Sequence, residues 1–150
     1  MKALVTGGMG FVGSHLMEKL SRLEIPAVAL DVQSRNKEEM ECQKRLFSFV
    51  RGDAQNRDLV QHILEDADID TVVHLAGVSN TVDTALGQAP AYTSGFIVLA
   101  TVYDAIIDLK KKSPDREIRV LIASSCLTCG VFETSSNNCP PASLCLAGNA

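Results

Sequence analysis

The residues with the clearest chemical potential form a glycine-rich run at positions 6–15, with the sequence TGGMGFVGSH. The apolar residues 2–5 before it predict a strand, and the apolar positions after it predict a helix with its stripe at Val12, Leu16, Leu20 and Leu23. When a glycine turn joins a strand to a helix, the backbone N–H groups at the start of the helix can bind a phosphate. Glycine has no side chain that would hold the phosphate away from these groups. The run therefore predicts a turn that binds a diphosphate.

Asp31 is the acidic residue that a dinucleotide site of this kind requires. It closes a second apolar run, residues 27–30, and lies eighteen residues after Gly13, close to the spacing of a ribose-binding carboxylate. A carboxylate there accepts hydrogen bonds from the ribose hydroxyls and repels a 2′-phosphate, which favours NAD over NADP. Arg35 lies near enough to pair with a 2′-phosphate, so NADP stays the weaker expectation. The alternative is that Asp31 only ends a strand in a turn.

The bulk composition fits one compact α/β domain. The chain has 150 residues, of which 46% are hydrophobic, and a net charge of −4, which argues against nucleic acid as a partner. Its basic cluster, Lys110–Lys112, is expected at the exposed end of a helix. No run of eighteen apolar residues predicts a membrane span, and the strand expected directly after Met1 leaves no room for a signal peptide. We therefore expect a cytoplasmic protein with reduced cysteines and no membrane partner.

Strands and helices are expected to alternate along the chain. Further strands are expected at residues 46–50, 71–75 and 120–123, helices at 56–66 and 91–109, and a loop with a short helix at 33–45. The side chains expected to face inward from the two helices are Leu59, Val60, Ile63 and Leu64, and Phe96, Leu99, Tyr103 and Ile106. Apolar strands between helices predict a doubly wound parallel sheet, with strand order 3-2-1-4-5 and a ligand crevice between the first and fourth strands.

Several motifs occur together in a recognisable order: TGGMGFVG at residues 6–13, Asp31, Gly52-Asp53, HLAG at residues 74–77 and Ser124-Ser125. In this order they resemble the extended short-chain dehydrogenases/reductases, and most of all the NAD-dependent nucleotide-sugar epimerases and dehydratases. The resemblance runs from Met1 to about Gly130 and does not specify a substrate. It implies a Rossmann fold, NAD as the cofactor, a nucleotide sugar as the small-molecule substrate, and transient oxidation of a sugar hydroxyl by hydride transfer. A homodimer is a further expectation.

The resemblance assigns roles in the glycine-rich turn residue by residue. Gly7, Gly10 and Gly13 match the three glycines of the family. Phe11 and Val12 match positions whose backbone N–H groups lie near the diphosphate. These five residues are therefore the expected diphosphate site.

The resemblance also places the two ends of the cofactor. Asp53, followed by Ala54, matches the aspartate that binds the adenine amino group, although a turn residue or a helix N-cap is an alternative role for Asp53. Leu75, Ala76 and Gly77 match the segment under the nicotinamide-side ribose, where small residues let the backbone approach the ligand. Packing of this strand end on the first helix is compatible with that role.

Ser125 is the expected substrate-binding hydroxyl. It matches the serine or threonine that lies five residues before a family glycine, here Gly130, at the end of the fifth strand. By resemblance, its hydroxyl binds the substrate oxygen that is oxidised or reduced. The alternative is a strand-ending serine that bonds its own backbone.

The Tyr-x-x-x-Lys pair of the family is missing from its expected place. In the family, the tyrosine moves the proton and the lysine lowers the pKa of the tyrosine. Neither Tyr92 nor Tyr103 has a lysine at the fourth following position. In the best match, residues 141–149, Cys145 replaces the tyrosine and Asn149 replaces the lysine. We favour a truncated or diverged member that holds NAD without efficient turnover over one in which Cys145 transfers the proton.

The end of the chain raises a related expectation. Extended family members continue with a C-terminal substrate domain, which we expect to be missing here, and residues 131–150 are expected to form an irregular tail of the single NAD-binding domain. The fifth strand would then leave an uncovered sheet edge. We therefore expect low stability alone or a partner that covers this edge. A non-catalytic NAD-binding or regulatory module is the second functional hypothesis.

The cysteines and histidines allow a rival hypothesis of a metal site. Four thiols lie close together in the sequence, at Cys126, Cys129, Cys139 and Cys145. The first two have a spacing that suits zinc, whereas the last two do not, so no metal site is expected. No two histidines share a ligand spacing: His15 is expected to pack on the first helix, and His74 to hydrogen-bond the backbone within a buried strand.

Overall fold

The computed structural model describes residues 1–33, 47–77 and 89–123, and for residues 89–94 the backbone alone. Its five strands are β1 (Ala3–Thr6), β2 (Ala27–Asp31), β3 (Phe47–Arg51), β4 (Thr71–His74) and β5 (Arg119–Ile122). All pair in parallel, in the order β3-β2-β1-β4-β5. The expected topology is therefore confirmed, and each strand begins and ends within one residue of its predicted bounds.

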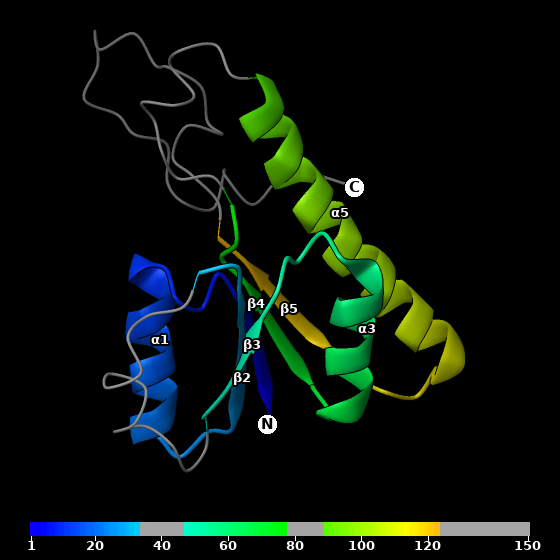
Figure 1. Cartoon of the computed structure of the whole chain (residues 1–150). Coiled ribbons are helices and arrows are strands. Elements are labelled where there is room, and N and C mark those ends of the chain that lie inside the picture. The colour runs from blue at the N-terminus through cyan, green and yellow to red at the C-terminus, as the bar shows by residue number, and fades with distance from the viewer. Residues whose placement is uncertain (34–46, 78–88, 124–150) are drawn as a thin grey trace, which may run out of the picture.

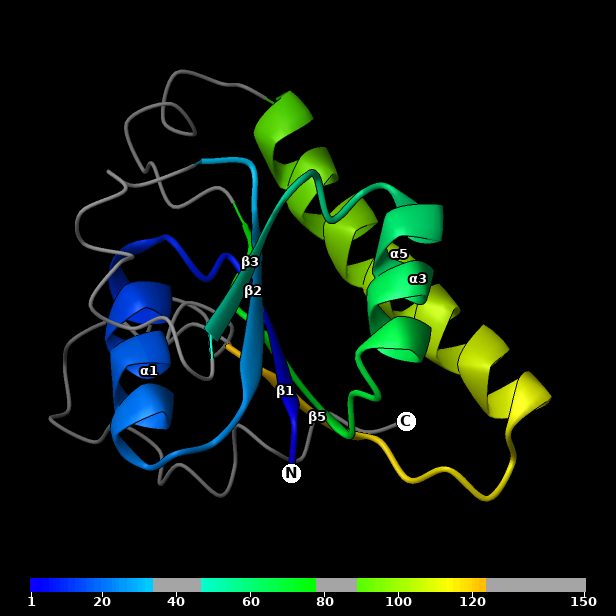
Figure 2. The same ribbon diagram turned by 60° about the horizontal axis from the view of Figure 1, so that its bottom comes forward.

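Within the described residues, three helices cover the two faces of this sheet. Helix α1 (Phe11–Arg22) lies on one face, and α3 (Arg57–Asp66) and α5 (Ala89–Lys112) lie side by side on the other (Figures 1 and 2). Because the strand order runs outward from β1 in both directions, right-handed connections place helices on both faces, which is the doubly wound arrangement that the sequence predicts. None of the helices in the described ranges is long and apolar enough to span a membrane.

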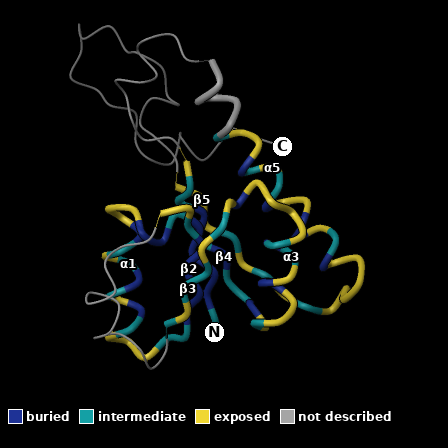
Figure 3. Tube along the Cα trace, in the orientation of Figure 1, coloured by how far each residue is buried: buried dark blue, intermediate teal, exposed yellow. Residues whose placement is uncertain are grey.

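The strands are apolar throughout because alternate residues face two different cores. Leu4 packs in the core under α3 and α5, whereas its neighbours Ala3 and Val5 pack in the core under α1. Figure 3 shows buried residues along the central strands and exposed residues on the outer faces of the helices. Burial on both faces removes the alternation of polar and apolar residues that marks a half-exposed strand.

The buried faces of α1 and α5 differ from the prediction. In α1, Met17 and Leu20 are buried, whereas Val12 is 62% exposed and Leu23, which follows the helix, is 55% exposed. In α5 the residues that face the core are Val98, Val102, Ala105, Ile106 and Leu109. Ile106 was predicted correctly, but Phe96 and Tyr103 are 78% and 40% exposed. Helix α5 carries apolar residues on two stripes, so periodicity alone cannot decide which stripe meets the sheet.

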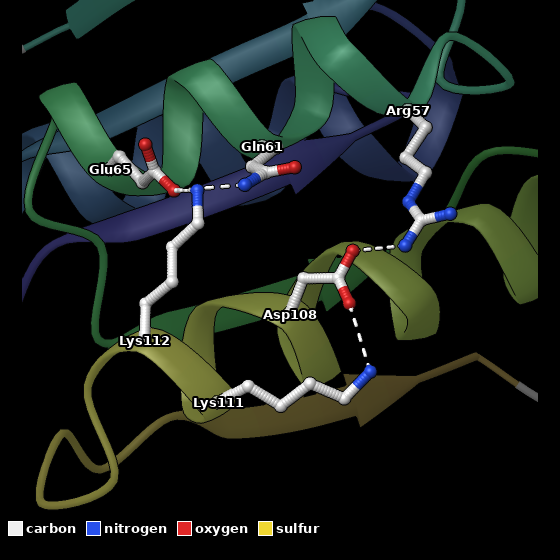
Figure 4. Close-up of polar contacts among 6 residues, drawn as sticks. All are labelled: Arg57, Gln61, Glu65, Asp108, Lys111 and Lys112. Carbon is white, nitrogen blue, oxygen red and sulfur yellow. Dashed lines mark hydrogen bonds and ion pairs between the residues drawn. The ribbon is translucent and has the colours of Figure 1, made fainter.

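Charged side chains join α3 to α5 on the protein surface (Figure 4). Asp108 accepts hydrogen bonds from Arg57 across the helix pair and from Lys111 on its own helix, and Lys112 Nζ lies 2.7 Å from the Glu65 carboxylate. The hydrogen bond from Arg57 holds the pKa of Asp108 below its ordinary value. Surface ion pairs of this kind contribute little individually, but here they link α5, which lines the site described below, to α3, which directly follows another part of its lining. The basic cluster at residues 110–112 is the last turn of α5, as predicted.

Candidate functional site

A cavity of about 560 Å³ opens at the carboxyl ends of the strands. It is lined by Gly7, Gly10, Phe11, Val12, Gly13, Leu30, Asp31, Val32, Gln33, Gly52, Asp53, Ala54, Gln55, Leu75, Ala76, Gly77, Gly95 and Val98. All eleven residues predicted to bind the cofactor lie in this lining. The structure thus brings together four segments far apart in the sequence, each following a different strand, at the edge where α/β sheets bind ligands.

The turn between β1 and α1 forms the floor of the cavity, and there is no room for a Cβ at Gly7 in the turn or at Gly13 in the first turn of α1. Gly7 has a φ of +71°, and an added Cβ there would lie 2.8 Å from the backbone nitrogen of Ala76. A Cβ on Gly13 would overlap the carbonyl oxygen of Gly7 and lie 2.8 Å from the Cα of Gly8. These close approaches bring the start of α1 tightly under the turn.

The first turn of α1 carries no competing acceptor. Its N-cap, Gly10, has no side chain to cap the helix, and no acidic residue lies in the first turn. Helix α3 differs, because the Asn56 side chain accepts a hydrogen bond from the backbone N–H of Leu59 and Asp58 lies in its first turn. The N–H groups at the start of α1 therefore remain directed at the cavity, which favours an anion there.

Asp31 faces the same cavity from the end of β2. One carboxylate oxygen, Oδ2, accepts a hydrogen bond of 2.9 Å from the backbone N–H of Met9, and Oδ1 accepts one of 3.0 Å from the N–H of Gln33. Asp31 therefore tethers the glycine turn, a role that the sequence did not indicate. Each oxygen keeps a further lone pair that can accept a hydrogen bond from a ligand hydroxyl.

Asp53 and Ala54 form the wall beside β3. Asp53 Oδ1 accepts a hydrogen bond of 2.9 Å from the N–H of Gln55, which makes Asp53 a turn residue. The N-cap of α3 is Asn56, so the alternative of Asp53 as the helix cap is wrong. The turn leaves Asp53 exposed at the cavity and buries Ala54.

Leu75, Ala76 and Gly77 form the opposite wall, directly after β4. The Leu75 N–H donates to the backbone oxygen of Thr6 at 3.0 Å, so this wall lies against the end of β1. His74 hydrogen-bonds the side-chain hydroxyl of Thr6 and not the backbone, which corrects the prediction. Burial lowers the pKa of His74, which keeps its imidazole neutral near pH 7.

His15 and the lining residues that the sequence analysis did not predict are placed by the elements that carry them. His15 is exposed on α1, where its ring lies 4.9 Å from the ring of Phe11. Gln33 and Gln55 line the cavity through the turns that follow the two aspartates, and a turn signal could have found them. Gly95 and Val98 come from α5, and only the packing angle of that helix places them at the cavity.

Several predictions fall outside the described residues. They concern Ser125, the four clustered cysteines including Cys145, and the tail at residues 131–150. They also concern the loop expected at residues 33–45, which contains Arg35 and of which only Gln33 is described. Their roles stay predictions. Within the described ranges, no group of three or more His, Cys, Asp or Glu residues could hold a metal ion.

Comparisons with known proteins agree with this geometry. The UDP-glucose 4-epimerase of Azospirillum brasilense is 36% identical over 76 residues, which cover 51% of this chain and 21% of that protein. The dTDP-glucose 4,6-dehydratase of an Actinoplanes species is 32% identical over 119 residues, which cover 71% of this chain and 36% of the relative. This chain therefore spans well under half the length of these two relatives.

A solved structure shows the same arrangement. The dTDP-glucose 4,6-dehydratase of Bacillus anthracis in complex with NAD superposes with a TM-score of 0.69 and 25% identity, covering 91% of this chain and 41% of that one. The model of the family described as "NAD dependent epimerase/dehydratase family" matches residues 3–144. Because that match covers nearly the whole sequence, this chain belongs to the NAD-dependent epimerase/dehydratase family.

Proposed function

We propose that this chain binds NAD in the cavity and forms the cofactor-binding part of an enzyme that acts on nucleotide sugars. One observation carries the proposal: the uncapped N-terminus of α1, under a turn that only glycine can form, faces the same cavity as the Asp31 carboxylate. An anion site and a hydroxyl acceptor in one cavity match the diphosphate and ribose of a dinucleotide. The residues present therefore fit NAD.

Each wall of the cavity has a role in this proposal. The N–H groups of Phe11 and Val12 bind the diphosphate, and Asp31 binds the adenosine ribose. Asp53 and Ala54 hold the adenine. Leu75, Ala76 and Gly77 support the nicotinamide-side ribose, with no bulky side chain at Ala76 or Gly77 to hold the ligand away.

The reaction class follows from the family. NAD bound here would accept a hydride from the sugar carbon that carries the reacting hydroxyl. Ser125 would bind the oxygen of that hydroxyl. One relative named above is a 4-epimerase, and the others are 4,6-dehydratases. The proposal therefore specifies a nucleotide sugar as the substrate class but not which product is formed.

Residues 1–150 contain no tyrosine followed at the fourth position by lysine. We therefore expect this chain to bind NAD without turnover of UDP-glucose or dTDP-glucose. Calorimetry measures the binding, and chromatography of the sugar nucleotides measures the turnover. Turnover would contradict the expectation, and its loss in Cys145→Ser, with NAD binding retained, would assign the proton transfer to Cys145. Binding without turnover would also fit the regulatory-module hypothesis.

We further propose a homodimer that forms through the outer face of α5. Phe96, Ala100, Tyr103 and Ile107 are exposed on α5, at spacings of four, three and four residues. This spacing forms one apolar stripe, and such a stripe packs well against a second copy of itself. Pairing of two copies would cover the aromatic residues that the sequence analysis placed in the core.

The double substitution Phe96→Ser and Ile107→Ser is expected to convert a dimer to a monomer, because it removes the two large and wholly apolar side chains at the ends of the stripe. Sedimentation equilibrium measures the change. Leu121→Ser is the matched control, since Leu121 is 56% exposed on β5, the edge strand for which the sequence predicted either low stability or a partner that covers it. A monomeric wild type, or a dimer that dissociates only in Leu121→Ser, would contradict the α5 interface.

A further inference from the structure

Thr6 and His74 form a buried polar pair directly under the cavity. They are register partners at the carboxyl ends of β1 and β4, and they are 0% and 5% exposed. Thr6 Oγ1 lies 2.8 Å from His74 Nδ1. These two are the buried polar residues among the otherwise apolar buried positions of the described chain, so their chemistry needs an explanation beyond core packing.

The hydrogen bonds around Thr6 indicate which group donates to which. The backbone N–H of Ala76 donates to Thr6 Oγ1 over 3.4 Å. The hydroxyl hydrogen of Thr6 then has His74 Nδ1 as its acceptor, which places the imidazole proton on Nε2. With a proton on Nδ1 instead, the Thr6 hydroxyl would lose this acceptor in a fully buried place, and burial already disfavours the charged imidazole. The pair therefore forms a directed chain from Ala76 through Thr6 to His74.

This chain connects two walls of the cavity. Thr6 immediately precedes Gly7 in the floor, and His74 immediately precedes Leu75 in the opposite wall. The backbone adds a second link, because the Leu75 N–H donates to the Thr6 oxygen at 3.0 Å. The absence of a Cβ at Gly7 is what allows Ala76 to approach this closely. The Thr6 hydroxyl is thus the side-chain tie between the floor and this wall.

We propose that Thr6 and His74 are positioning residues that set the separation between the glycine turn and the Leu75–Gly77 wall, and thereby the affinity for NAD. The inference rests on the proposed NAD site. Neither side chain lines the cavity, so both act through the backbone next to them. NAD must contact both walls at once, and a wall that shifts when the tie is lost leaves one set of contacts unmade.

Thr6→Val tests the pair, because valine keeps the volume of threonine and removes only the hydroxyl. We expect the Kd for NAD to rise about fivefold, the equivalent of one net hydrogen bond. Thr6→Ser restores the hydroxyl and is expected to recover most of the affinity. Calorimetry gives the Kd, and hydrogen exchange of the Leu75–Gly77 amides without NAD is expected to be faster in Thr6→Val than in wild type.

Val72→Ala is the matched control for lost stability alone. Val72 is fully buried two residues earlier on β4 and does not line the cavity. The Val72→Ala substitution is expected to lower the unfolding midpoint, while the Kd for NAD stays at the wild-type value. The positioning role is wrong if Thr6→Val binds NAD as wild type does, or if Val72→Ala weakens binding as much. A wild type that binds no NAD would overturn the proposed function itself, whereas amide exchange would still report whether the tie holds the wall.

Discussion

Gly13→Ala is expected to abolish NAD binding and to lower the free energy of unfolding by about 3 kcal/mol, at the upper end of the usual cost of overpacking. The added Cβ would overlap the Gly7 carbonyl oxygen, which belongs to the backbone and cannot rotate away. The start of α1 would have to move away from the turn, and its N–H groups would leave the diphosphate position. Thermal unfolding with and without NAD measures both effects. NAD should raise the wild-type midpoint and leave that of the variant unchanged.

Gly95→Ala is the matched control for the stability part of this prediction. Among the described residues, no atom outside the chain neighbours and the local helix backbone lies within 4 Å of a Cβ added at Gly95, which is in α5. Alanine favours a helix over glycine by about 0.5–1 kcal/mol, so the midpoint should stay the same or rise. A folded Gly13→Ala protein whose midpoint still rises with NAD would contradict the role given to the turn.

Asp31→Asn is expected to weaken NAD binding about tenfold or more and to reduce the preference for NAD over NADP. The substitution keeps the shape of the side chain but replaces one acceptor oxygen with an N–H₂ group. That group cannot accept from Met9, Gln33 or a ribose hydroxyl, and hydrogen bonds to a charged partner are the stronger kind. Loss of the negative charge also removes the repulsion of a 2′-phosphate. Parallel titrations with NAD and NADP measure both changes.

Asp66→Asn controls for the change in net charge. Asp66 is the last residue of α3, pairs with His62 at 3.0 Å and is 63% exposed. It lies about 15 Å along the helix from the cavity end, so its charge is well screened there. We expect wild-type affinity for both cofactors. Equal losses in the two variants would show a general charge effect and contradict the specific role of Asp31.

The parts of the fold predicted well from the sequence are those set by local pattern and chain connectivity. Each strand is a short apolar run between polar turns, so the sequence predicts its first and last residues closely. The right-handedness of the connections between parallel strands then predicts the strand order. The glycine run and Asp31 were found because each follows a strand, whereas Asp53, Ala54 and Leu75–Gly77 were found by the resemblance to the family. Their meeting in one cavity is a consequence of parallel strands ending at the same edge.

The parts that failed depend on contacts between distant residues. The helical spacing predicts Val12 as a core residue, yet Val12 lines the cavity. The residue of this part of α1 that packs against the glycine turn is Gly13 instead. Phe96 and Tyr103 lie on one of two apolar stripes of α5, and tertiary packing chose the other. The Thr6–His74 bond joins residues 68 positions apart, and no local signal marks it.

The most direct test of the whole account is a calorimetric titration of the folded wild-type chain with NAD and, separately, with NADP. Folding is first checked by circular dichroism and a cooperative unfolding transition. The account predicts saturable binding of NAD at one molecule per chain, with NADP weaker. Folded protein that shows no saturable binding of either cofactor, or that prefers NADP, would contradict it.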